Sequence, residues 1–66
     1  MEYEDLVANE AAVTLEIYLH GENHMKLDRA AMIAAVTNKS VEEVQTDIYN
    51  QFRENLDKFY SIVRVH

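Results

Sequence analysis

The last third of the chain, from Ser40 to about Val65, has the apolar periodicity of one long amphipathic helix. At about 1.5 Å per residue this helix would be roughly 37 Å long, which is more than the rest of a 66-residue chain can cover. The pattern therefore predicts a helix that extends beyond the body of the domain. Its apolar residues recur at steps of three or four, as one helical face requires: Val41, Val44, Ile48, Phe52, Leu56, Phe59 and Val63.

The rest of the sequence predicts two further helices in a single helical domain, residues 1–66. Proline is absent and Gly21 is the one glycine, so few residues interrupt helical structure. We expect an all-α fold of three helices near residues 4–20, 28–36 and 40–64, with a short central helix. Residues 30–36 include no polar side chain, which predicts that the second helix lies in the middle of the fold.

Several residues have the chemistry of helix ends. Gly21 can adopt the left-handed conformation that closes a helix, and Asp28 is a good first cap for the next one. Ser40, with Glu43 three residues later, forms the pattern of a capping box at the start of the long helix. The connection between residues 21 and 26 is short and polar, so the second helix should turn back on the first.

The first predicted helix is apolar around most of its circumference. Its polar residues form one narrow stripe, so the helix should be buried on more than one side. Glu10 falls inside the apolar sector. Either it lies at the edge of that sector with its carboxylate in water, which we favour, or it is enclosed and paired with a base. The polar stripe consists of Asp5, Asn9, Ala12, Glu16 and His20.

Size and apolar content together leave self-association or unusually good helix packing as the source of stability, and we expect self-association. A chain this short buries only about 60% of its unfolded surface, and without cysteine it has no disulfide to compensate. A homodimer through the long helix and the spare face of the first helix would cover the excess apolar surface. The edges of the apolar faces carry Tyr18, Tyr49 and Tyr60, which fit either an interface or the rim of the core. The candidate interface residues are Leu6, Glu10, Val13, Ile17, Phe52, Leu56, Phe59, Tyr60 and Val63.

The net charge is −6, and residues 1–19 contain five acidic residues and no Lys or Arg. Nucleic-acid binding depends on neutralising phosphates, so this balance disfavours a nucleic-acid partner and suits a basic protein or simple solubility. No apolar run approaches the length of about 20 residues that spans a bilayer. The first residues also lack the positive charge of a secretory signal, so we expect a cytoplasmic protein without a membrane partner.

Residues 30–52 have the spacing of a helix-turn-helix, with a short apolar helix, a three-residue turn and a Ser-capped second helix. The segment IAAVTNKSVEEVQTDI resembles the corresponding part of bacterial repressors of the DeoR type. The resemblance implies that the second helix lies in the major groove of DNA. It also implies that four side chains are offered to the bases: Gln45, Thr46, Tyr49 and Asn50.

The sequence contains no convincing site for chemistry. His20, Glu22 and His24 supply too few ligands for a structural zinc site, and His66 has no partner in the pattern. No Ser, Thr or Lys has a predictable catalytic base beside it. We therefore expect no cofactor, no metal and no enzymatic activity. The favoured function is that of a small acidic regulatory protein that binds another macromolecule, most simply a protein; the alternative is a helix-turn-helix transcription regulator.

Overall fold

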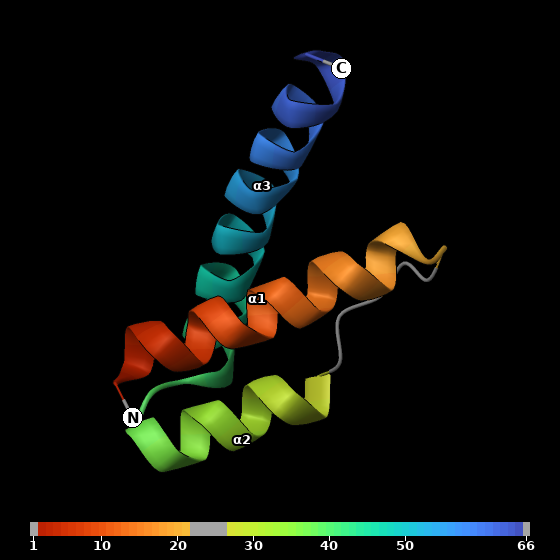
Figure 1. The fold of residues 1–66 in the computed structure, drawn as a ribbon. Coiled ribbons are helices and arrows are strands. Elements are labelled where there is room, and N and C mark those ends of the chain that lie inside the picture. The colour runs from red at the N-terminus through yellow and green to blue at the C-terminus, as the bar shows by residue number, and fades with distance from the viewer. Residues whose placement is uncertain (1, 22–26, 66) are drawn as a thin grey trace.

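The computed structural model describes residues 2–21 and 27–65, which form three α-helices (Figure 1). Helix α1 spans Tyr3–Leu19, α2 spans Leu27–Thr37 and α3 spans Val41–Val65. No strand occurs within these ranges. The predicted all-α class, the short central helix and the long third helix are confirmed, with every boundary within one residue of its predicted position. Helices α1 and α2 run in opposite directions, as Figure 1 shows.

The helix ends follow local chemistry. Gly21 has φ +95°, and its amide donates a hydrogen bond to the Tyr18 carbonyl, which closes α1. The Ser40 hydroxyl accepts a hydrogen bond of 3.1 Å from the Glu43 amide, so the predicted cap of α3 is confirmed. Asn38 closes α2 in the left-handed region, at φ 58°. The Lys39 amide then donates back to the Ala34 carbonyl at 3.1 Å, as in a Schellman motif. The predicted cap Asp28 lies outside the described side chains.

The buried core is small and draws on all three helices. Alanines supply three of its seven apolar members, and their small side chains let the helix backbones come close. Helix α3 has its most extensive packing with α1. Tyr3, Leu6 and Phe52 pack around this core while keeping part of their surface in solvent. The core residues are Val7 and Ala11 from α1, Ala30, Ile33 and Ala34 from α2, and Val44 and Ile48 from α3.

The prediction that α2 lies in the middle of the fold is wrong. Met32 is 67% exposed and Val36 is 76% exposed, so one face of α2 is open to solvent. Its opposite face, with Ala30, Ile33 and Ala34, reaches the core. Three helices cannot enclose one of their own number on all sides. The absence of polar side chains from residues 30–36 therefore did not mean that this part of α2 is buried on all sides.

The second half of α3 extends beyond the other helices, as predicted. Figure 1 shows α1 lying across the first half of α3 while the C-terminal turns continue away from the body. The resulting molecule measures 42 × 22 × 17 Å. Ile62 and Val63 continue the apolar repeat on these last turns and are 61% and 53% exposed. The overhang leaves part of the apolar face of α3 without a partner within the chain.

Candidate functional site

Where α1 crosses α3, aromatic side chains occupy one side of the crossing. The rings of Tyr18 on α1 and Phe52 on α3 meet edge to face, with centroids 5.6 Å apart. About two turns farther along α3, Phe59 and Tyr60 make a similar contact at 5.8 Å. We call this surface the aromatic side. It consists of Tyr18 from α1 and, from α3, Phe52, Leu56, Phe59, Tyr60 and Val63.

Tyr60 joins the overhanging part of α3 to the end of α1. Its hydroxyl group interacts with that of Tyr18, and this neighbour raises the pKa of Tyr60 through charge repulsion and a hydrogen bond. Tyr60 is nevertheless 45% exposed. The aromatic side is therefore anchored at its inner end and open to solvent at its outer end.

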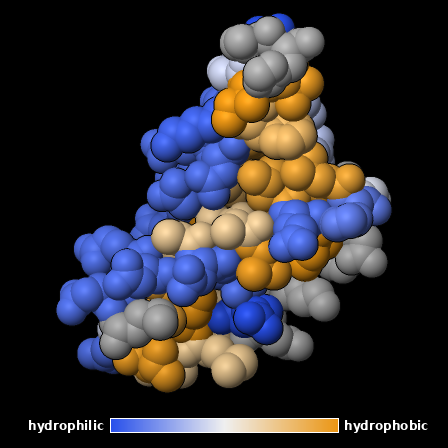
Figure 2. All heavy atoms as spheres, viewed as in Figure 1, coloured by the Kyte–Doolittle hydropathy of each residue, from blue (hydrophilic) through white to orange (hydrophobic). Residues whose placement is uncertain are grey.

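The open end of the aromatic side is apolar. Figure 2 shows hydrophobic atoms gathered along one side of the upper part of α3, with hydrophilic atoms on the opposite side. Ile62 and Val63 extend this apolar surface toward the C-terminal end of α3, and Leu19 at the end of α1 is also exposed. Isolated exposed apolar residues are common on proteins, whereas a contiguous apolar strip is typical of a binding surface.

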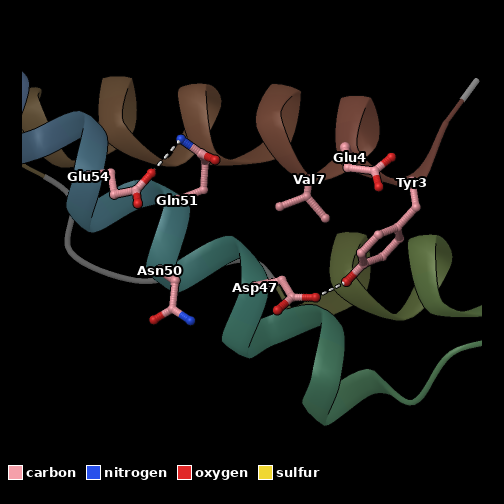
Figure 3. Close-up of a pocket in the computed structure, with 7 residues that line it drawn as sticks. All are labelled: Tyr3, Glu4, Val7, Asp47, Asn50, Gln51 and Glu54. Carbon is pink, nitrogen blue, oxygen red and sulfur yellow. Dashed lines mark hydrogen bonds between the residues drawn. The ribbon is translucent and has the colours of Figure 1, made fainter.

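The other side of the same helix crossing is an acidic groove of about 280 Å³ (Figure 3). Three carboxylates line it and no basic side chain does. Gln51 donates hydrogen bonds to Glu54 at 3.5 Å and to Asn55 at 3.2 Å. The groove is open to solvent, so its carboxylates can remain hydrated. Its lining residues are Tyr3, Glu4, Val7, Asp47, Asn50, Gln51 and Glu54.

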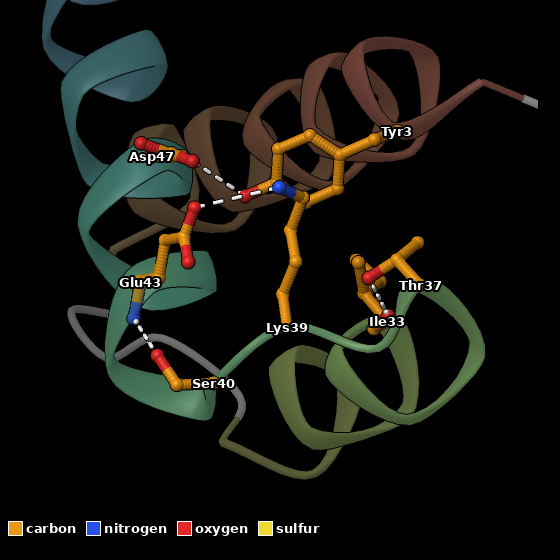
Figure 4. Close-up of polar contacts among 7 residues, drawn as sticks. All are labelled: Tyr3, Ile33, Thr37, Lys39, Ser40, Glu43 and Asp47. Atoms are coloured by element: carbon orange, nitrogen blue, oxygen red, sulfur yellow. Dashed lines mark hydrogen bonds and ion pairs between the residues drawn. The ribbon is translucent and has the colours of Figure 1, made fainter.

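At the end of the groove nearest the start of α1, a polar network joins α1 to the start of α3 (Figure 4). The Tyr3 hydroxyl donates a 2.5 Å hydrogen bond to the Asp47 carboxylate. The Lys39 ammonium lies 4.6 Å from the centre of the Tyr3 ring and 3.4 Å from the Glu43 carboxylate. Burial, together with the hydrogen bond to Asp47 and its negative charge, raises the pKa of Tyr3. The sequence offered no signal for this contact, because Tyr3 and Asp47 are 44 positions apart.

Glu10 is buried, which overturns the favoured interpretation that it lies at the edge of its face. The residue is 6% exposed, and its carboxylate accepts a 2.9 Å hydrogen bond from Arg29 Nε on α2. The alternative, an enclosed carboxylate paired with a base, is the one that the structure shows. Arg29 keeps more than half of its own side chain in solvent. The ion pair therefore joins α1 to α2 within the chain.

The structure brings some candidate interface residues together and separates others. Phe52, Leu56 and Phe59 are half-buried on the aromatic side, and Tyr60 and Val63 are exposed at its open end. On α1, Val13 is exposed and Ile17 is half-buried. Leu6 packs against the core, and Glu10 pairs with Arg29, so these two serve the interior of the chain. The polar stripe predicted on α1 faces solvent throughout: Asp5, Asn9, Ala12, Glu16 and His20.

The candidate DNA contacts lie along the first half of α3. Thr46, Tyr49 and Asn50 are exposed, and Gln45 is half-buried. Asn50 lines the acidic groove. The guanidinium carbon of Arg53 lies 5.9 Å from the centre of the Tyr49 ring. Exposed carboxylates, including those of Glu42 and Glu43, flank the start of this helix, and such a surface repels a phosphate backbone.

No arrangement in residues 2–21 and 27–65 could hold a metal ion through three His, Cys, Asp or Glu side chains. Of the histidine cluster considered in the sequence, only His20 falls within these ranges, since Glu22 and His24 lie outside them, as does His66. Among the described helices, none is long and apolar enough to cross a membrane. In comparisons with protein-family models, curated proteins and solved structures, nothing matched this chain. The resemblance to DeoR-type repressors therefore has no support beyond the residues that suggested it.

Proposed function

We propose that this protein acts by binding another protein chain, and that it associates with a second copy of itself through the open end of the aromatic side. The observation that carries this proposal is the run of exposed apolar side chains on the overhang of α3: Tyr60, Ile62 and Val63. Water is an unfavourable environment for such a strip, and burying it against another chain removes apolar area from water at about 25 cal/mol per Å².

The anchoring of the strip supports a role in binding. Phe52 packs against the core at one end of the aromatic side, and the Tyr18 ring fixes its position. A partner would therefore meet a surface that is already ordered, which lowers the entropic cost of association. Aromatic residues bury large areas with few rotatable bonds, and tyrosine is enriched at protein interfaces for this reason.

Sedimentation equilibrium between about 10 µM and 1 mM, a range that covers weak to moderate affinities, tests self-association. We expect a reversible monomer–dimer equilibrium for the natural sequence. Ile62→Lys should shift this equilibrium to monomer, because a charge cannot be buried in an apolar contact without a large cost. Val36→Lys is the matched control, since Val36 is exposed on α2, away from the overhang. A monomer at every concentration would contradict the proposal.

We extend the same proposal to a basic protein as the binding partner. The first turn of α1 presents Glu4 and Asp5 to solvent next to Glu2, and no base in that turn neutralises them. Reversing the three charges to Lys should weaken association with a basic protein while leaving self-association through α3 intact. Unchanged binding of a basic partner would remove this surface from the proposal.

DNA binding through Gln45, Thr46, Tyr49 and Asn50 is the alternative function. The exposure of three of these side chains favours it, and the acidic surroundings disfavour it. A gel-shift experiment with random duplex at low salt separates the two functions. A retarded band that weakens steeply with salt, and that is lost in Asn50→Ala, would support DNA binding over our proposal.

A further inference from the structure

We propose that the second copy packs antiparallel to the first, so that the overhang of each α3 lies along the aromatic side of the other chain. This inference rests on the proposed self-association and adds the relative orientation of the two chains. Four helices then meet at the contact: α3 and the end of α1 from each chain.

The exposed area of the chain is close to what such a contact requires. The accessible surface is 4979 Å², whereas a monomeric protein of 7.7 kDa is expected to expose about 4300 Å². The excess, roughly 650 Å² per chain, approaches the area of about 800 Å² that each partner buries in an interface of standard size. The overhang contributes to this excess because Ile62 and Val63 are more than half exposed.

The position of α1 determines whether a second α3 can pack parallel or antiparallel to the first. Val44 and Ile48 lie on the same apolar face of α3 as the overhang residues, and there α1 and α2 already cover them. A second α3 laid parallel and in register on this face would meet α1 and α2 along its first half (Figure 1). A second α3 laid antiparallel, overlapping only beyond Leu56, meets the overhang and the end of α1. The body of each chain then stays clear of the other.

The distribution of charge favours the same direction. Residues 53–65 contain three bases and two acids, whereas residues 1–19 contain five acids and no base. A parallel pair would place the two acidic bodies side by side, where like charges repel. An antiparallel pair separates the bodies and brings the basic tip of α3, with the exposed Arg64, toward the partner's α1, which carries the exposed Glu16.

Spin labels on two single-cysteine variants, Arg53→Cys and Arg64→Cys, measure the direction. Both arginines are exposed, and the chain has no other cysteine. The two positions are eleven residues apart, which is about three helical turns, so they lie on the same side of α3. Because their orientation is matched, a parallel in-register dimer gives the same distance between paired labels for both variants.

An antiparallel dimer gives two different distances. With the overlap centred near residue 60, two copies of residue 53 are separated by about 20 Å along the helix axis and two copies of residue 64 by about 12 Å. Pulsed electron paramagnetic resonance at a concentration where sedimentation shows dimer should therefore give the longer distance for Arg53→Cys. Circular dichroism of both labelled variants checks that the helices are retained.

Each other outcome has a distinct meaning. Equal distances would overturn the antiparallel direction and leave the proposed self-association standing. A longer distance for Arg64→Cys, or no measurable coupling in a sample that sediments as a dimer, would place the contact elsewhere and overturn the inference. A sample that sediments as monomer throughout would overturn the proposed self-association itself.

Discussion

The two halves of α3 have the same apolar repeat and opposite environments. In the first half Val44 and Ile48 are fully buried, whereas in the second half Ile62 and Val63 are mostly exposed. Both pairs lie on one continuous helix from Val41 to Val65. The difference comes from what lies opposite: α1 and α2 cover the first half, whereas the described contact of α1 with the second half is that of Tyr18 with the exposed Tyr60. Apolar periodicity therefore marks an apolar face of the helix without showing how much of that face the chain itself covers.

The covered half of α3 also holds polar contacts that join it to the rest of the chain. The hydrogen bond from Tyr3 to Asp47 and the contacts of Lys39 with Tyr3 and Glu43 lie there. Along the overhang the described contacts are the ring contact of Phe59 with Tyr60 and the interaction of the Tyr60 hydroxyl with Tyr18 of α1. We infer that the covered half determines the stability of the monomer, and that the overhang is available for association. Four substitutions, each with a matched control, test this division.

The largest effect is expected from Ile48→Ala. Removing a fully buried isoleucine loses transfer free energy and leaves a cavity, which together cost about 2–4 kcal/mol. The same change at Ile62, on the same helix but 61% exposed, should cost less than about 0.5 kcal/mol in dilute solution. Urea denaturation followed by circular dichroism measures both. Similar losses at the two positions would contradict the division of α3 into a structural half and a binding half.

Arg29→Ala should have the second largest effect. It leaves the buried Glu10 carboxylate without its base, and because Arg29 itself is 57% exposed in its side chain, solvent limits the loss to about 1–2 kcal/mol. Arg53→Ala is the control, because Arg53 is exposed and its guanidinium lies near the ring of Tyr49, which is exposed too. The free energy of unfolding near pH 7 should drop for the first variant and stay nearly constant for the second.

Tyr3→Phe should cost about 1 kcal/mol, the contribution of a typical hydrogen bond, because it removes the donor to Asp47. The pKa of Tyr3 is raised in the folded chain, so the unfolded chain loses this proton first as the pH rises. The contribution of Tyr3 to stability is therefore complete below about pH 10 and falls at higher pH. In Tyr3→Phe this part of the decline should vanish, whereas Tyr49→Phe, at an exposed ring, should retain it.

Ser40→Ala should have the smallest effect, about 0.5–1 kcal/mol, because it removes the hydroxyl that caps the first turn of α3. Ser61→Ala on the exposed surface of the overhang is the control and should change stability by less than about 0.5 kcal/mol. Thermal unfolding of the two variants at one concentration makes the comparison. Equal melting temperatures would mean that the start of α3 needs no cap.

Local patterns predicted the helices well because each pattern acts within a few residues. The spacing of Val44, Ile48 and Phe52 predicted the apolar face of α3. Gly21 predicted the end of α1, and Ser40 predicted the start of α3. The candidate site was predicted in part. Phe52, Leu56, Phe59, Tyr60 and Val63 do gather on one side, but Tyr18 was recognised only as a residue at the edge of a face.

The partners across helices could not be predicted, for a physical reason. Glu10 is joined to Arg29 and Tyr3 to Asp47, and such pairs depend on how the helices cross rather than on spacing along the chain. The exposure of Met32 and Val36 was missed for a related reason. An apolar helix can be buried on every side only where enough neighbouring helices surround it. The sequence of the helix does not show how many neighbours it has.

The sequence by itself determined three helices, their ends and an apolar face on α3 longer than the chain can cover, because backbone hydrogen bonding and side-chain periodicity are local. Only the tertiary structure decided which half of that face is covered. It also placed acidic residues on one side of the crossing of α1 and α3 and aromatic residues on the other. The physical reason is that burial and pairing depend on the angle and position at which separate helices meet, and these are set by the packing of the whole core.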